Sequence, residues 1–425
     1  MRTFIAYTIL SFLWLTSLGN YVEVTRSANV YSESNSGSTK LFKAEVGQEY
    51  ELVSSERVNG YFNIKIPNSE LTGWIYRSLV RHHEQDLPSN LSMNELPTEG
   101  ELKVSVIDVG AGLCTVIEMP NGQYVIYDAG HYRGSGRIAY NQILEVLPSN
   151  VPISMMILSH TDGDHIGAAS YLLENHLVNH LLWTGYEKSM ISSSAPTKTY
   201  GRLETALNSI SYEMINENLN DRDSMVVPGT EIQFGAATMT LICGFGSPLD
   251  SWGRLTNSEQ LNAVSIVVKV EYGGTSVLIT GDAVGRHLDD PPGSLIATEH
   301  YMINEAGEYI DSDIILAPHH GADNGSSEAF IEAVSPEVVI FPAGSHHDHP
   351  RESTALRYLE HVDINNIYRT DRGDDEGGHS GDSKDWKHES IEGCTDSYRD
   401  DDIEIVIRAN GEYSVNYLRP NPECD

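Results

Sequence analysis

The chain of 425 residues is longer than one average domain, so its length allows two or three folded units. With 40% hydrophobic and 21% charged residues, its composition excludes a disordered chain or one that is largely embedded in a membrane. The formal net charge of -34 disfavours non-specific binding to nucleic acid or to anionic membranes. A bound multivalent metal reverses that field locally, so the charge does not exclude a phosphodiester substrate.

The first 19 residues have the order of a secretory signal peptide. A positive start at Arg2 precedes an apolar run from Phe4 to Leu15, and small residues follow as far as Gly19. The apolar run is shorter than the roughly 20 residues of a spanning helix. We therefore expect an exported protein that is periplasmic, extracellular or associated with the cell wall, with an uncleaved anchor as the alternative.

Residues 20–81 are predicted to form a small all-β domain. Short alternating runs at 21–24, 50–53 and 61–66 are separated by turns rich in Gly, Ser and Asn. The pattern resembles bacterial SH3-like modules at residues 25–30, at Val46-Gly47 and at 72–75. This resemblance implies a cell-wall peptide as a partner. The alternative is a purely structural barrel with Trp74 in its core.

A polar segment, 82–100, contains Pro88 and Pro97 and is predicted to be a linker. The large domain is expected to span residues 101–425. Its apolar runs predict strands at 102–108, 123–128, 155–158, 263–270, 276–280, 314–317, 338–341 and 403–407, with helices at 138–147 and 327–334. The mixture predicts an α/β domain.

An Asp-rich and Gly-rich stretch near 371–402 is predicted to be a solvated acidic insertion, with a calcium site as the alternative.

The chain has four cysteines. Cys394 and Cys424 could form a disulfide in an oxidising compartment. Cys114 and Cys243 lie in apolar runs and are expected to be buried thiols.

The strongest chemical signal follows the predicted strand at 155–158. His160, Asp162, Asp164 and His165 leave this strand on one short loop, and imidazole with carboxylate suits zinc or a similar ion. Further candidate ligands follow other predicted strands, namely Asp282 after 276–280 and the pair His319 and His320 after 314–317. Four ligands within six residues can be shared by two adjacent ions, which polarise an ester and supply a hydroxide at neutral pH.

In this order, the motifs resemble the metallo-β-lactamase superfamily, and most of all the hydrolase domain of DNA-uptake (competence) channel proteins. The segments that carry the resemblance are 108–112, 128–130, 159–167, 262–265, 280–282 and 318–321. The resemblance implies an αββα sandwich, two divalent metal ions (Zn²⁺, with Mn²⁺ as the alternative) and a metal-bound water or hydroxide as the nucleophile.

The resemblance also implies a role for each candidate ligand. Asp164 and His320 are expected to act in catalysis together with the metal-bound water, although His319 and His320 could exchange roles. The implied metal ligands are His160 and Asp162 at the first ion, Asp164, His165 and His319 at the second, and Asp282 between the two.

Two positions depart from the usual family pattern. Asp162 stands where the family has its middle histidine, which makes the site harder and admits manganese. Asn262 stands where many members have a single histidine, so the first ion is expected to be held loosely. His176 and His180 could substitute, but their apolar surroundings favour structural roles. His349 resembles a histidine of related families and is a candidate for the substrate pocket.

We consider three functions. The first is hydrolysis of a small-molecule or polymeric phosphoester, and the second is hydrolysis of an amide or lactone such as a β-lactam. The third, of a different class, is a wall-binding protein whose large domain is only a scaffold. No long apolar runs follow residue 19, so at most the hydrolase part of a competence system, and not its transmembrane channel, is expected.

Overall fold

The structure is a computed structural model that describes residues 21–44, 46, 48–66, 71–83, 100–131, 136–149, 151–192, 195–222, 224–291, 293–344, 349–371 and 402–418. The predicted signal peptide, residues 84–99 of the linker, residues 372–401 of the acidic insertion, and Cys394 and Cys424 lie outside these ranges. The chain divides into two compact units, residues 1–88 and 89–425. Their boundary falls inside the segment predicted to be a linker.

The N-terminal unit is all-β in its described part, as expected from its short alternating runs. One sheet has the strand order β3-β2-β6-β5-β4-β1-β7. Its core includes Val22, Val30, Ile64 and Ile75, whereas Trp74 is only half-buried. The SH3-like assignment stays a prediction. The strands are β1 (Tyr21–Val24), β2 (Ala28–Tyr31), β3 (Lys40–Ala44), β4 (Glu49–Val58), β5 (Tyr61–Lys65), β6 (Thr72–Tyr76) and β7 (Val80–His83).

Two sheets form the centre of the large unit. The first has the order β13-β12-β11-β10-β9-β8-β21-β22 and the second β14-β15-β16-β17-β18-β19-β20. The strands of the first sheet are β8 (Leu102–Val106), β9 (Cys114–Glu118), β10 (Tyr124–Ala129), β11 (Ile153–Leu158), β12 (His180–Trp183), β13 (Ile215–Asn218), β21 (Ile403–Ile407) and β22 (Tyr413–Tyr417). Those of the second are β14 (Thr230–Phe234), β15 (Ala237–Cys243), β16 (Val267–Tyr272), β17 (Thr275–Ile279), β18 (Ile314–Leu316), β19 (Val338–Phe341) and β20 (Ile367–Arg369).

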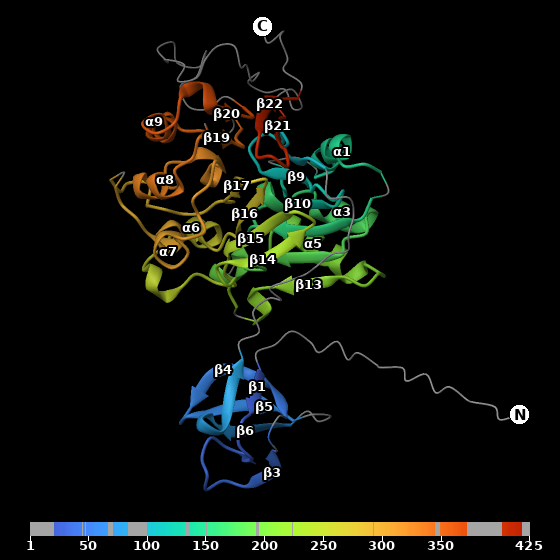
Figure 1. Ribbon diagram of the computed structural model, residues 1–425, viewed down its shortest axis with the longest axis vertical. Coiled ribbons are helices and arrows are strands. Elements are labelled where there is room, and N and C mark those ends of the chain that lie inside the picture. The colour runs from blue at the N-terminus through green and yellow to red at the C-terminus, as the bar shows by residue number, and fades with distance from the viewer. Residues whose placement is uncertain are drawn as a thin grey trace, which may run out of the picture. The chain divides into compact units, whose positions relative to one another are not determined.

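Helices cover both sheets, as the two flanks of the large unit in Figure 1 show. One apolar core joins the first sheet to α1, α3 and α5, and another joins the second sheet to α7, α8 and α9. This is the expected sandwich. No helix among the described residues is both long and apolar enough to cross a membrane. The helices are α1 (Arg137–Val146), α2 (Gly163–Ile166), α3 (Ala169–Asn175), α4 (Lys188–Ile191), α5 (Lys198–Ser209), α6 (Asn257–Ala263), α7 (Ala297–Glu305), α8 (Glu328–Val334) and α9 (Glu352–Leu359).

The strand predicted at 263–270 is wrong at its start. Thr256 and Glu259 form a capping box that begins helix α6, and this helix runs to Ala263 before β16 begins at Val267. The apolar run therefore spans a helix end, a turn and a strand. The other predicted strands and helices of the large domain are present within a few residues. Cys114 and Cys243 are free and buried, as predicted.

Parallel pairing brings several chain segments to one edge of the sandwich. Strands β10 and β11 are parallel in the first sheet, and β17, β18 and β19 are parallel in the second. At this edge the sheets are joined where Ile266 N donates to Ser159 O (3.0 Å) and Tyr127 Oη donates to Ile266 O. The candidate ligands leave the carboxyl ends of these parallel strands.

A glycine allows the ligand loop to pack closely on strand β10. A Cβ atom added at Gly130 would lie 1.4 Å from the carbonyl oxygen of Asp164. The same loop is fixed by a hydrogen bond from Leu113 N to Asp164 O (3.0 Å). The position of Asp164 therefore depends on the absence of a side chain at residue 130.

We expect Gly130→Ala to lower the free energy of unfolding by about 3 kcal/mol, because backbone atoms on both sides must move. Gly201→Ala is the matched control. It lies inside helix α5, where an added Cβ meets no atom within 4 Å, and should stabilise the protein by about 0.5–1 kcal/mol. Urea unfolding followed by circular dichroism measures both. Equal stabilities of the two variants would contradict this packing.

Candidate metal centre

Strand β11 ends at Leu158 and delivers the predicted ligand loop directly to the joint between the sheets. Asp162 precedes the short helix α2, so the chain turns and places His165 back against His160, with ring centroids 4.1 Å apart. Both imidazoles have no exposed surface. Asp162 and Asp164 retain partly exposed side chains. The loop thus presents two buried imidazoles and two carboxylates that solvent can reach.

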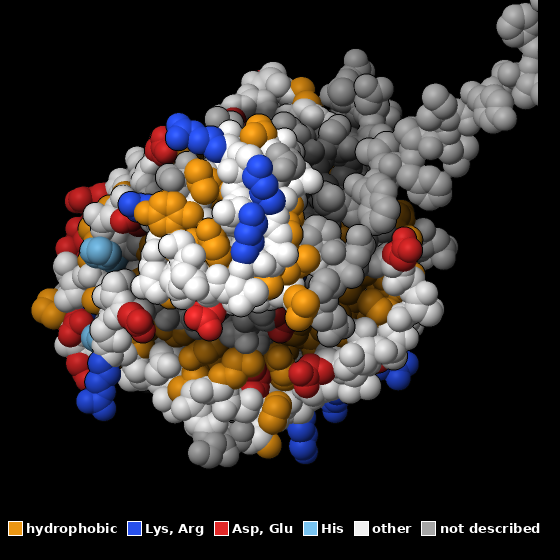
Figure 2. Space-filling model, turned by 90° about the horizontal axis from the view of Figure 1, so that it is seen from below, with side chains coloured by type: hydrophobic (Ala, Val, Ile, Leu, Met, Phe, Trp, Pro, Cys, Tyr) orange, Lys and Arg blue, Asp and Glu red, His pale blue; other side chains and the backbone are white. Residues whose placement is uncertain are grey.

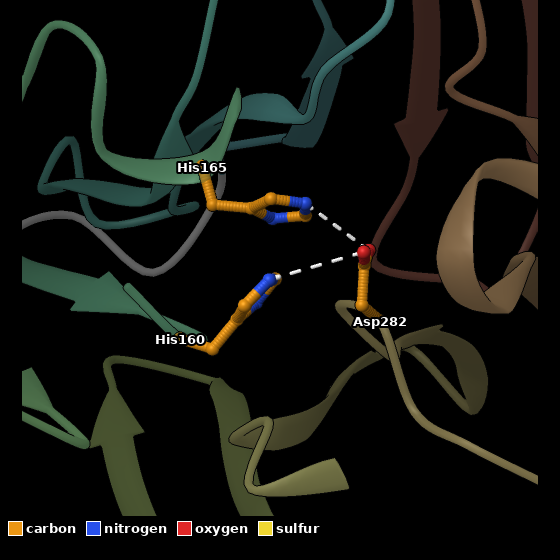
Figure 3. A group of neighbouring side chains, drawn as sticks. All are labelled: His160, His165 and Asp282. Carbon is orange, nitrogen blue, oxygen red and sulfur yellow. Dashed lines mark ion pairs between the residues drawn. The ribbon is translucent and has the colours of Figure 1, made fainter. Parts of the chain in front are cut away.

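Asp282, which follows strand β17, is the point on which the imidazoles converge. Its Oδ1 lies 3.1 Å from His165 Nε2 and 3.5 Å from His320 Nε2. Its Oδ2 lies 3.5 Å from His319 Nε2 and 3.8 Å from His160 Nε2. Figure 3 shows His160 and His165 pointing at this carboxylate. The arrangement is that of a bridging carboxylate between two sets of ligands.

In each of the four imidazoles, Nδ1 has a hydrogen-bond partner other than Asp282. His165 Nδ1 donates to Asp128 Oδ2 (2.7 Å), and His320 Nδ1 donates to Pro342 O (2.7 Å). His319 Nδ1 donates to Asn324 Oδ1 (2.6 Å). His160 Nδ1 lies 3.0 Å from Ser159 Oγ. These partners hold the tautomers that carry a lone pair on Nε2, as in histidines that bind metal.

The electrostatics of the site set the protonation of its ligands. Burial opposes protonation of His165, but the carboxylates of Asp282 and Asp128 outweigh it and raise the pKa of His165 well above its ordinary value. Burial lowers the pKa of His160 well below its ordinary value, and the adjacent His165 lowers it further. Burial opposes ionisation of Asp282, but His165 and His319 outweigh it and bring the pKa of Asp282 well below its ordinary value. Burial and the adjacent Asp164 carboxylate raise the pKa of Asp162 to about 7. A neutral imidazole beside an ionised carboxylate is the donor set that a cation requires.

These residues fit two divalent cations. His160 Nε2 is buried and has no hydrogen-bond partner among the described residues, and His165 Nε2 faces His320 Nε2 at 3.1 Å. Without a cation, a proton on His165 offsets the charge of the Asp282 carboxylate, 3.1 Å away, and a divalent cation would take the place of that proton. The two groups with metal-binding geometry are His160, His165 and Asp282, and Asp164, His165 and His320.

Comparison with known proteins agrees with this geometry. Residues 107–182, which include the ligand loop, match the model of the family described as "Metallo-beta-lactamase superfamily". The resemblance to the metallo-β-lactamase superfamily, which the order of the motifs predicted, is confirmed over these residues.

Three curated relatives of the large domain carry names linked to competence or recombination. "Recombination protein 2" of Haemophilus influenzae is 27% identical over 57% of the chain and 24% of the relative. "Competence protein ComA" of Neisseria gonorrhoeae is 31% identical over 24% of the chain and 13% of the relative. "ComE operon protein 3" of Bacillus subtilis is 24% identical over 65% of the chain and 32% of the relative. The chain thus spans about a third or less of these proteins.

The two adjacent histidines, His319 and His320, have different surroundings in the structure. Both follow strand β18 in a turn of left-handed conformation, with φ values of 50° and 57°. His320 is the one that groups with Asp164 and His165, and His319 Nε2 instead faces Asp282 Oδ2 and Asn262 Nδ2 (3.2 Å). The geometry favours His320 as the ligand of the second ion. The sequence left this exchange open.

The two unusual positions lie on the side of the first ion. Asp162 Oδ2 is 3.8 Å from His160 Nε2, and Asn262 Nδ2 is 3.4 Å from Asp282 Oδ2. The oxygen of the Asn262 side chain is buried without a hydrogen-bond partner among the described residues. His349 also reaches this region, with its ring 5.8 Å from that of His319 and 6.5 Å from that of His320. His346 and His347 lie outside the described residues.

Two other histidines make contacts outside the cluster. His176 Nε2 lies 3.2 Å from the hydroxyl of Tyr140, and His180 Nε2 lies 3.4 Å from the Glu217 carboxylate. Both contacts are made within the first sheet and its helices. These placements are those of structural side chains, which is the role that their sequence surroundings favoured.

The sequence did not assign roles to Asp128 and Asn324, which support the ligands. Asp128 lies at the end of strand β10, and its carboxylate accepts from Ser159 N (2.7 Å), Ser159 Oγ (2.6 Å) and His165 Nδ1. Asn324 accepts from His319 Nδ1. The Asp128-Ala129-Gly130 motif was part of the family resemblance and was the available signal for Asp128. No such motif marks Asn324.

We expect Asp128→Asn to weaken metal affinity by about 10-fold to 100-fold, because the amide replaces one acceptor of the Ser159 and His165 hydrogen bonds with a donor. Titration with zinc and a competing chelator measures the change. Asp311→Asn, at an exposed position before β18, is the control and should bind as the wild type does. Unchanged affinity in Asp128→Asn would rule out this supporting role.

Proposed function

We propose that the large domain hydrolyses phosphodiester bonds with two bound divalent metal ions, Zn²⁺ or Mn²⁺. The observation that carries this proposal is the convergence of four Nε2 atoms on the two oxygens of Asp282, within 3.1 to 3.8 Å. Such a paired site is suited to clamp the attacking and leaving oxygens of an in-line displacement. The domain's resemblance to a hydrolase superfamily agrees with this chemistry.

The side chains around the proposed site have different roles in the reaction. When bound, the metal ions polarise the ester and lower the pKa of water. Asp164 lies on the exposed side of the cluster, with its side chain 23% accessible, and its Oδ2 is 3.9 Å from His320 Nε2. It is therefore placed to orient the attacking water and to take its proton. The buried His160, His165 and Asp282 keep the site rigid.

Two observations favour a phosphodiester over a β-lactam. Asp162 places a carboxylate beside His160 where the family pattern has a histidine, and a harder donor suits ions that bind phosphate oxygens. The names of the relatives refer to competence and recombination, and recombination acts on DNA. On the face that Figure 2 draws, Lys and Arg side chains are scattered among acidic and uncharged ones.

The test is hydrolysis of bis-(p-nitrophenyl) phosphate and of nitrocefin with Zn²⁺ or Mn²⁺, beside elemental analysis. Asp282→Ala removes the bridging ligand, and we expect it to lose bound metal and to lose at least about 10²-fold of its phosphodiesterase activity. Asp311→Ala, at the exposed control position, should behave as the wild type does.

The other outcomes separate the competing functions. Bound metal with cleavage of nitrocefin alone would favour an amide or lactone hydrolase. A wild-type protein without metal and without turnover under any ion would favour a scaffold domain, and the catalytic proposal would then be abandoned.

We also propose that the protein is exported and that its N-terminal β domain is an SH3-like module that binds cell-wall peptide. An aromatic cluster on this domain supports the second proposal. The ring of Tyr61 lies 4.9 Å from that of Tyr76 and 6.3 Å from that of Tyr31, and Tyr76 is 37% exposed. Exposed aromatic side chains supply contact area at low entropic cost.

We expect Tyr76→Ala to reduce the fraction of protein that sediments with purified peptidoglycan by about tenfold, the size of a modest interface hot spot. Val53→Ala removes another exposed side chain of the same domain, 47% accessible, and is the control. If the two variants sediment equally, the aromatic cluster does not bind peptidoglycan.

A further inference from the structure

A second pair of titratable side chains is not used in the chemistry above. His287 Nδ1 lies 2.8 Å from Glu259 Oε1. The Glu259 side chain is 7% exposed, whereas the His287 side chain is 36% exposed. A buried carboxylate thus holds an imidazole that reaches solvent.

This pair is close to His319 along two routes. Glu259 lies in helix α6, three residues before Asn262, so the two side chains share one face of the helix. Asn262 Nδ2 is 3.2 Å from His319 Nε2. From the other side, Arg286 N donates to Asn324 O (3.1 Å), and Asn324 Oδ1 accepts from His319 Nδ1 (2.6 Å). His287 follows Arg286 in the chain, so both routes lead from the pair to His319.

The first turn of helix α6 fixes the orientation of the His287 imidazole. Glu259 Oε2 accepts from Thr256 N (2.8 Å) and completes the capping box, which leaves Oε1 for His287. Burial opposes ionisation of Glu259, but the hydrogen bonds from Thr256 and His287 outweigh it and lower the pKa of Glu259. The ionised carboxylate fixes Nδ1–H toward itself, so Nε2 is the nitrogen turned away from helix α6. This is the orientation that a carboxylate gives to an acid–base histidine.

We propose that His287 is the proton donor to the leaving group, oriented by Glu259; this inference rests on the proposed phosphodiesterase function. As the water oxygen bonds to phosphorus, the bond from phosphorus to the leaving oxygen breaks, and that oxygen takes the proton from His287 Nε2. The attacking water gives up one proton to the solvent by way of Asp164, and His287 regains one from the solvent. The products are a phosphomonoester and an alcohol.

The dependence on the leaving group tests this role. A nitrophenolate leaves without being protonated, whereas an alkoxide requires a proton in the transition state, and such transfer contributes about 10²-fold to 10⁴-fold. We therefore expect His287→Gln to lose about 10²-fold or more of its turnover of a thymidine dinucleotide. Its turnover of bis-(p-nitrophenyl) phosphate should not change. Glutamine can still donate to Glu259, so the tie to helix α6 is kept.

The matched control is His300→Gln, at an exposed position in helix α7, which should leave both activities unchanged. Metal content and the urea midpoint of each variant show whether the site and the fold are intact. If His287→Gln lowers both activities equally, or neither, His287 only ties a loop to the helix and the proposal is overturned. If the wild type hydrolyses neither substrate, the phosphodiesterase function itself fails. If His287→Gln does not fold, His287→Asn is measured against the same criteria.

Discussion

The candidate site depends on one buried carboxylate, Asp282, whose charge is offset by the imidazoles that surround it. Four imidazole nitrogens approach the two oxygens of Asp282, and His165 Nε2 is only 3.1 Å from His320 Nε2. Each imidazole is fixed through its other nitrogen, so the rings cannot simply turn away. A buried carboxylate has to be compensated by opposite charge or by hydrogen bonds, and here a proton on His165 supplies part of that compensation. A divalent cation would replace this proton while the surrounding hydrogen bonds keep the rings in place.

The fold supplies this arrangement by its topology. Parallel strands point their carboxyl ends to one edge, and the loops that follow β10, β11, β17, β18 and β19 meet there. His160 and His165 come from one sheet, while Asp282, His319 and His320 come from the other. Apolar cores behind each sheet hold the strands, so the ligand loops need few contacts of their own. Function is therefore placed on loops that carry little of the stability.

Much of the fold and the site could be predicted from the sequence because ligand types and strand periodicity are local signals. The loop from His160 to His165 and the lone Asp282 stand directly after apolar runs, and the structure brings them together. The choice between His319 and His320 was not predictable, because it depends on two consecutive left-handed residues. The pairing of His287 with Glu259 was not predictable either, because the two residues are 28 positions apart and strands β16 and β17 lie between them. Helix α6 was missed, although Thr256 and Glu259 have the spacing of a capping box.

The candidate ligands come from both sheets, so the distances between them depend on how the two sheets pack against each other. The hydrogen bond from Tyr127 Oη to Ile266 O links the two sheets, and neither side chain is a candidate ligand. A displacement of one sheet against the other by a fraction of an ångström would change the distances between ligands of different sheets before it altered any ligand within one sheet. The size of the cation that these ligands accept would thus be governed partly by the packing between the layers. Substitutions in the interior would then change the metal preference while every ligand stayed the same.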